Sequence, residues 1–262
     1  MASIATFAAE AWLEVSELLD PQLFPLGQLA IDALGAKQSD VIIDVGCGVG
    51  QTVLQLAEIV GPDGQVIGVD IAPLLLERAR ERAFGLKQTR FIECDASQLR
   101  LPKNSIDGIF SRFGVMRFAD PVATFRNFHS IMKPSARLAF VCWRSLDENE
   151  LDIMPLRAAG LEQYVDKTPF SFEKREVLQT TLNAAGFEQV LIEPHDCPVS
   201  SGGLEEMLKV LLKVGAVGKI VRENPEMREN VERKLRPALA PKVVQGELSL
   251  NAAVWVVTGV AC

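Results

Sequence analysis

VIIDVGCGVGQTVLQLA, residues 41–57, is the segment from which the architecture of the chain is best inferred. Its first five residues are apolar around one aspartate and do not alternate with polar residues, which is typical of a strand buried on both faces of a sheet. Three glycines then let the backbone turn sharply and approach a ligand: Gly46, Gly48 and Gly50. From Val53 onward, apolar residues recur at helical spacing. The pattern predicts a ligand site between a strand and a helix N-terminus, at the carboxyl edge of a parallel sheet.

The spacing of these glycines separates two classes of ligand. The dinucleotide fingerprint is G-x-G-x-x-G, but here the third glycine comes one position early and Gln51 stands in its place. Asp44 precedes the turn by two residues, and a carboxylate there suits a cationic amine and a sulfonium better than a pyrophosphate. The next predicted strand ends at Asp70, where an acid can accept hydrogen bonds from ribose hydroxyls.

Five segments in this order resemble the motifs of class I S-adenosylmethionine-dependent methyltransferases. They are DVGCGVG, VIGVDIA, FIECDASQLRLP, SIDGIFSRFGVM and IMKPSARLAFVCW, and they span about residues 40–143. The segments SRFGVM, FADP and FVCWR also resemble a bacterial subgroup of small-molecule methyltransferases that is related to the ubiquinone/menaquinone C-methyltransferases.

Strands that alternate with helices along the chain predict an α/β fold with a doubly wound parallel sheet. The resemblance implies a Rossmann-like, mostly parallel, seven-stranded sheet whose last strand, 252–259, runs antiparallel beside strand 187–193. We expect a helical cover at residues 1–36, with a break near Asp20–Pro21, and a methyltransferase core at residues 37–262. A helical insertion at about 203–240 is interpreted as a lid over the substrate entrance, although a decorative helical pair fits the sequence equally well.

Composition limits the class of protein. The 262 residues are 48% hydrophobic and 23% charged, a globular balance, and the net charge of −7 without a basic block argues against a nucleic-acid partner. No signal peptide and no apolar run long enough to span a membrane are recognised. Five scattered cysteines fit a reduced cytoplasm. Two histidines and no Cys-x-x-Cys pair make a metal site unexpected. We expect a cytoplasmic monomer or homodimer.

The resemblance implies which residues bind S-adenosylmethionine (SAM). The methionine end is expected to lie against the glycine loop and the end of the fourth strand, with Asp44 near the amine and Cys47 contributing backbone only; the residues are Asp44, Gly46, Cys47, Gly48, Ser111 and Arg112. At the adenosine end, Asp70 is expected to hold the ribose hydroxyls and Ile71 to pack on the adenine. Asp95 would accept from the adenine amino group, and Ala96 would leave room for the ring.

Residues that handle the substrate are harder to infer, because the cofactor carries an already activated methyl group and a methyltransferase can lack an invariant catalytic residue. His195 follows the predicted sixth strand and could act as a general base, or it could be a part-buried loop residue. Trp143 could stack on a flat substrate and Arg144 could pair with an anionic one; both are equally compatible with packing at the rim.

The sequence therefore predicts a SAM-dependent methyltransferase that acts on O, N or C of a small apolar or aromatic metabolite and releases S-adenosylhomocysteine. Three alternatives remain: a SAM-binding enzyme of the same fold with a non-methylating, cyclase-type reaction, a macromolecule methyltransferase, and a non-enzymatic binding module.

Overall fold

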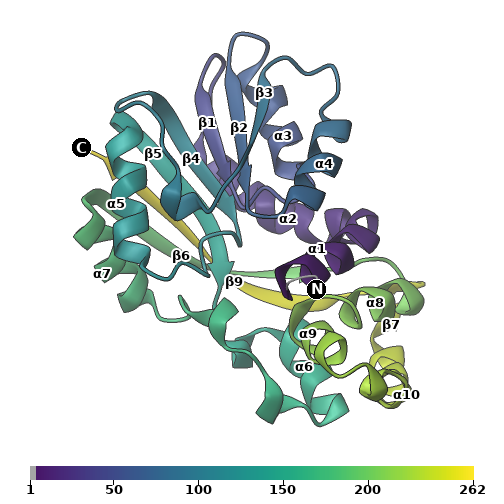
Figure 1. Cartoon of the computed structure of the whole chain (residues 1–262). Helices are drawn as coiled ribbons and strands as arrows, with labels where there is room; N and C mark the ends of the chain where they lie inside the picture. The colour runs from purple at the N-terminus through teal and green to yellow at the C-terminus, as the bar shows by residue number, and fades with distance from the viewer. Residues whose placement is uncertain (1–3) are drawn as a thin grey trace.

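The computed structural model describes residues 4–262 and contains a seven-stranded sheet in the order β3-β2-β1-β4-β5-β9-β6 (Figure 1). Every neighbouring pair from β3 to β5 is parallel, whereas β9 runs antiparallel to both β5 and β6. The predicted fold class is confirmed. The strands are β1 Val41–Val45, β2 Gln65–Asp70, β3 Thr89–Glu93, β4 Ile106–Arg112, β5 Met132–Trp143, β6 Phe187–Val199 and β9 Leu250–Ala261.

Helices cover both faces of the sheet. Because side chains alternate along a strand, neighbouring residues of β1 serve different cores: Ile42 packs with α2 and α3, and Ile43 packs with α5 and α7. The first core also takes in α4, whose Leu76 is fully buried. These five helices are α2 Ser16–Leu34, α3 Gln51–Val60, α4 Pro73–Arg82, α5 Pro121–Ile131 and α7 Arg175–Ala185.

The helical cover begins with α1, Ile4–Glu14, and continues as α2; Met1–Ser3 of the predicted cover lie outside the described residues. The predicted break near Asp20–Pro21 is wrong, because α2 runs through Pro21 and Pro25. A proline inside a helix removes one hydrogen bond and crowds the preceding turn. Here burial of the apolar face of α2 offsets that cost, since Leu26 and Ala30 on this face are completely buried.

A helical insertion lies between β6 and β9, as predicted. It contains three helices instead of two, because the chain turns between Leu211 and Gly215: α8 Leu204–Leu211, α9 Gly215–Glu223 and α10 Arg228–Leu239. A two-stranded hairpin follows, β7 Val243–Val244 and β8 Glu247–Leu248. Together with α6, Glu150–Ala159, these helices form a second helical layer beyond the sheet (Figure 1). A lid role for this insertion stays a prediction.

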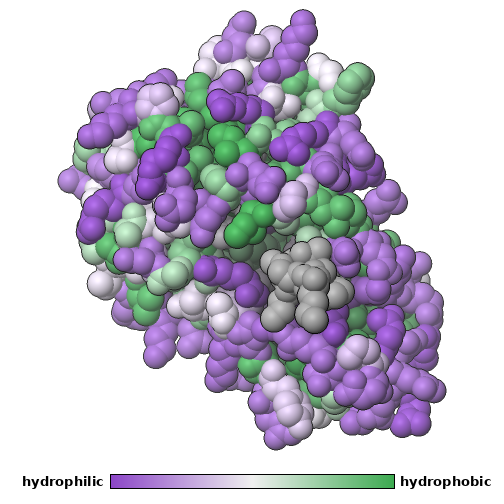
Figure 2. All heavy atoms as spheres, viewed as in Figure 1, coloured by the Kyte–Doolittle hydropathy of each residue, from purple (hydrophilic) through white to green (hydrophobic). Residues whose placement is uncertain are grey.

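Hydrophobic character is unevenly distributed over the surface and the helices. Hydrophilic residues cover most of the face seen in Figure 2, and hydrophobic residues gather over the sheet. Among the helices of residues 4–262, none combines the length and the hydropathy that a membrane span requires.

Candidate functional site

The glycine turn after β1 is shaped by close backbone contacts. Gly46 has a φ of 73°, and a Cβ there would lie 2.7 Å from the Cα of Gly114, so the end of β4 can approach only a glycine. Gly48 has a φ of 53°, and a Cβ built on it would meet no atom within 4 Å. The loop is thus packed against the protein at Gly46 and open at Gly48, where a ligand has room.

Asp44 lies completely buried beneath this loop. Its Oδ2 accepts a hydrogen bond of 2.5 Å from the Thr52 hydroxyl, and its Oδ1 has no hydrogen-bond partner among the described residues. Burial raises the pKa of Asp44 to about 7, against the opposing effects of Thr52 and Arg112. An unpaired buried acceptor costs about 1–3 kcal/mol, so a cationic donor placed here would be bound favourably.

Arg112, the last residue of β4, faces the same region. It donates from Nη1 to Oε1 of Gln51, the residue that departs from the dinucleotide pattern. Burial lowers the pKa of Arg112, and the negative charges of Asp44 and Asp20 oppose that effect. Among the described residues, only Nη1 of this guanidinium donates a hydrogen bond. The other nitrogens of Arg112 can therefore donate to an anionic group of a ligand.

A second set of contacts ties the cover helix to the glycine turn. Gln51 donates from Nε2 to the carbonyl of Asp20 over 2.8 Å, and Asp20 forms a 2.6 Å ion pair with Arg82 of α4. Arg82 also donates to the carbonyl of Val49, inside the turn, over 3.3 Å. Gln51, Asp20 and Arg82 were not among the predicted site residues. The mismatch at Gln51 was a usable signal, whereas the Asp20–Arg82 pair joins residues far apart in the sequence.

Asp70 stands at the end of β2 and holds the turn in place. Its Oδ2 accepts from the Gly48 N–H over 2.8 Å, and its Oδ1 accepts from the Ala72 N–H over 2.9 Å. Burial raises the pKa of Asp70, and these backbone hydrogen bonds lower it. Each carboxylate oxygen keeps a further lone pair, so the predicted contacts with ribose hydroxyls remain sterically and chemically compatible. Ile71 beside it is 65% exposed and presents apolar surface.

The remaining predicted cofactor residues show mainly structural contacts. Asp95 accepts from the Ser97 N–H over 2.9 Å and caps a short 3-10 turn in which Ala96 is buried. The Cys47 thiol is buried, which raises its pKa well above the usual range, and its N–H donates to the Val69 carbonyl. The contacts of these three residues with a cofactor stay predictions.

Ser111 is also fully buried. Its hydroxyl donates to the Val45 carbonyl over 2.8 Å and accepts from the Gly114 N–H over 3.0 Å. Ser111 thereby joins the carboxyl ends of β1 and β4. A direct contact of Ser111 with the cofactor stays a prediction.

The two residues expected to meet the substrate, Trp143 and Arg144, lie at the end of β5. The Trp143 ring stacks on Phe113, with ring centroids 4.0 Å apart and an angle of 17° between the planes. Arg144 is held by two acids: it forms a 3.0 Å ion pair with Asp196 and a shorter one with Glu148. The positive charge of Arg144 is therefore already neutralised within the protein.

His195 does not follow the sixth strand, so that expectation is wrong. β6 continues to Val199, and His195 lies within it, paired with Val254 of β9. β6 contains Pro194 and Pro198 and is the edge strand of the sheet, where a missing N–H costs no ladder hydrogen bond. The neighbouring Asp196 pairs with Arg144 instead of orienting the imidazole. A general-base role for His195 stays a prediction.

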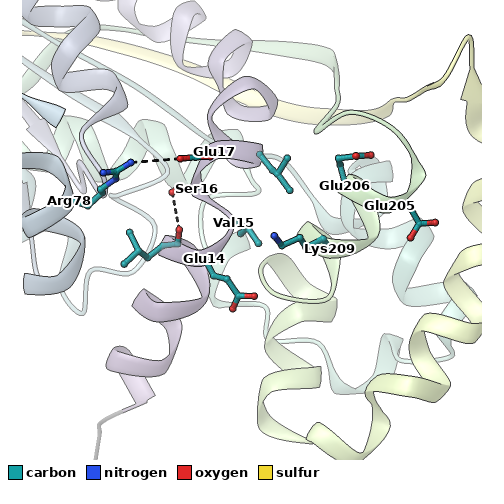
Figure 3. Close-up of a pocket in the computed structure, with 10 residues that line it drawn as sticks. Glu14, Val15, Ser16, Glu17, Arg78, Glu205, Glu206 and Lys209 are labelled. Atoms are coloured by element: carbon teal, nitrogen blue, oxygen red, sulfur yellow. Dashed lines mark hydrogen bonds and ion pairs between the residues drawn. The ribbon is translucent and has the colours of Figure 1, made fainter. Parts of the chain in front are cut away.

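A cavity of about 660 Å³ lies between the α1–α2 junction, α4 and α8 (Figure 3). Its charged lining consists of four glutamates and two basic residues: Glu14, Glu17, Glu205, Glu206, Arg78 and Lys209. Arg78 lies 3.8 Å from Glu17, the pair drawn with a dashed line in Figure 3. None of the predicted site residues lines this cavity. Residues 4–262 contain no cluster of His, Cys, Asp and Glu suited to a metal ion.

Comparison with known sequences adds a family match. Residues 36–186 match the family model described as "Methyltransferase domain". The chain is 27% identical over 164 residues to phosphoethanolamine N-methyltransferase 3 of Arabidopsis thaliana, covering 62% of this chain and 32% of the relative. It is 29% identical over 187 residues to demethylmenaquinone methyltransferase of Geobacillus stearothermophilus, covering 64% and 79%. The chain thus spans about a third of the length of the plant relative.

Solved structures show the same fold at low identity. Phosphoethanolamine N-methyltransferase 2 of Haemonchus contortus, in complex with phosphomonomethylethanolamine and S-adenosylhomocysteine, superposes with a TM-score of 0.63 at 16% identity, covering 99% of this chain and 60% of that one. The [4+2]-cyclase SpnF superposes with a TM-score of 0.54 at 21% identity, covering 90% and 80%. At these identities the likeness concerns the fold alone.

Proposed function

The chain belongs to the family of methyltransferase domains, and from this premise we propose that it transfers the methyl group of SAM to O, N or C of a small apolar or aromatic acceptor. The predicted family and its cofactor, SAM, are confirmed. The observation that carries the proposal is the unpaired Oδ1 of Asp44 beneath an open glycine turn.

The residues present fit this cofactor. Asp44 offers a buried acceptor for the amine, and Arg112 offers uncommitted donors on the same side of the turn. Gly48 leaves room for the methionine part, and Asp70 can accept from ribose hydroxyls while it anchors the turn. When bound, SAM supplies a methyl group that its sulfonium has already activated. The protein's task is to position the acceptor in line with that group and to exclude water.

The helices of the cover and of the insertion favour a small methyl acceptor over a macromolecule. We propose that the cover, residues 1–36, and the insertion, about 203–240, enclose the site from two sides. A 2.5 Å ion pair between Glu14 and Lys213 joins them, and the buried hydroxyl of Ser201, just before the insertion, donates to Gln22. An enclosed acceptor also favours a small molecule over a nucleic acid, in keeping with the net charge of −7.

Calorimetric titration with S-adenosylhomocysteine tests the cofactor site. Replacing Asp70 by Ala removes the acceptor of the Gly48 N–H and the proposed acceptor of the ribose hydroxyls. We expect binding to weaken by about 1–3 kcal/mol, the cost of leaving such groups unpaired. Asp63→Ala, which removes an exposed acid from a turn outside the site, is the matched control and should bind like the wild type. Equal affinities in the wild type and Asp70→Ala would refute the assignment.

A further inference from the structure

Phe113 has a backbone conformation that large side chains rarely adopt. Its φ is 63°, in the left-handed region, and such residues cost about 1–3 kcal/mol unless their surroundings enforce the conformation. The surroundings do so here, because the Phe113 N–H donates to the Val141 carbonyl and the next residue, Gly114, is held by the Ser111 hydroxyl. The chain thus keeps an aromatic side chain at a position where glycine would be less strained.

This conformation brings the Phe113 ring onto Trp143 at the end of β5. The rings are nearly parallel, at 17°, with centroids 4.0 Å apart. Both residues are only partly buried, although they pack against the cores on both faces of the sheet. The stack therefore leaves aromatic surface at the carboxyl edge of the sheet.

The stack lies next to the cofactor turn. Gly114, adjacent to Phe113, contacts Gly46, since a Cβ on either glycine would lie within 3 Å of the other's Cα. Phe113 also follows β4, and β4 and β1 flank the point where the strand order reverses. Ligands of open α/β sheets bind outside the carboxyl ends of the strands at that point. A molecule on the stack would therefore lie beside the methionine end of the cofactor.

The charges around the stack argue against recognition of an anion. Arg144 follows Trp143 in the chain and is already paired with Asp196 and Glu148. Arg112 precedes Phe113 and is fixed by Gln51 on the side of Asp44 and the cofactor turn. The part of the stack that remains exposed is therefore apolar, and the charges beside it are already engaged.

We propose that Phe113 and Trp143 form an aromatic plate on which the flat, conjugated ring of the methyl acceptor stacks, and that Phe113 is a specificity-determining residue. This inference rests on the proposed function and narrows its acceptor to planar ring compounds. The hydrogen bonds that enforce the strained conformation of Phe113 hold the plate beside the cofactor before the acceptor arrives.

The test uses two compounds with the same carbon skeleton, 2-naphthol, which is planar, and decahydro-2-naphthol, which is puckered. Each is titrated by calorimetry into protein saturated with S-adenosylhomocysteine, whose own affinity is measured first for every variant. The wild type should bind 2-naphthol about 3- to 10-fold more tightly than the saturated compound, the range expected for aromatic stacking. Phe113→Tyr, which retains the ring, should keep this preference.

Phe113→Gly removes the ring at a φ that glycine tolerates, so its fold should be preserved, and the preference should fall below about 2-fold. Trp143→Leu should have the same effect. Phe84→Gly is the matched control, because Phe84 is 92% exposed and remote in sequence from the site; it should behave like the wild type. The inference is overturned if the wild type binds the two compounds equally or binds neither, or if Phe113→Gly and Trp143→Leu keep the preference. The proposed function would fail in a different way: the wild type would not bind S-adenosylhomocysteine.

Discussion

At the scale of single residues, the buried carboxylate of Asp44, with one oxygen unpaired, is the proposed contact for the cofactor amine. The sequence places an acid before the glycine turn, and that position suffices to predict an acceptor near the ligand. It does not reveal that the Thr52 hydroxyl satisfies one oxygen and leaves the other unpaired, because that outcome depends on how α3 packs against β1. Ser111 is the reverse case: its position suggests a ligand contact, and the structure shows a hydroxyl that bonds two backbone groups.

The raised pKa of Asp44 predicts pH-dependent cofactor binding. Burial brings this pKa to about 7, and a cationic amine beside Oδ1 favours the ionised carboxylate. Below pH 7 binding must therefore release a proton, so S-adenosylhomocysteine affinity should rise with pH between about 5.5 and 7, by at most tenfold per unit. In the free protein the sign is opposite: a raised folded pKa means that stability falls as pH rises from the unfolded pKa towards 7.

Titrations in buffers of different ionisation enthalpy measure this proton release. Asp44→Asn keeps the shape of the side chain and removes its titration, so its affinity should be weaker and nearly independent of pH in the same interval. A wild-type affinity that is flat between pH 5.5 and 7 would contradict the placement of the amine beside Asp44.

At the scale of secondary-structure elements, the apolar periodicity predicts the existence of most strands and helices, and tertiary contacts set their ends. Pro21 suggested a helix boundary, but the buried stripe of α2 carries the helix past it. The sequence predicts a sixth strand that ends at residue 193, but β6 continues through Pro194 and Pro198 to Val199, because its edge position tolerates both prolines. The sequence near a proline shows neither how completely one face of a helix is buried nor whether a strand lies at the edge of the sheet.

Gln51, the first residue of α3, connects α2 and the end of β4 to the glycine turn. Gln51→Leu removes the donor to the Asp20 carbonyl and the acceptor of Arg112. Arg112 would then be left without a fixed partner, and we expect S-adenosylhomocysteine binding to weaken by about 1–3 kcal/mol. Calorimetry checks this against Gln163→Leu, an exposed glutamine outside the site. If both variants bind like the wild type, Gln51 has only a packing role.

At the scale of the whole molecule, five ordered motifs identify the sheet and the position of the cofactor turn. The contacts between the cover helices and the segment around the insertion could not be predicted, because they join residues that no motif relates. Glu14 meets Lys213, and Gln22 meets Ser201, so the first two helices and the insertion before the last strand contact each other. This arrangement supports an enclosed site, and with it a small acceptor.

The most direct test of the central claim is transfer of a labelled methyl group. The protein is incubated with methyl-labelled SAM and a bacterial cell extract that has been divided into small molecules, proteins and nucleic acids, and the label is followed by mass spectrometry. We predict label in the small-molecule fraction, on planar ring compounds, and less label with Asp44→Asn at equal protein concentration. Label in the protein or nucleic-acid fraction would contradict the small acceptor. Tight SAM binding with no label in any fraction would contradict methyl transfer and favour a non-methylating reaction on the same fold.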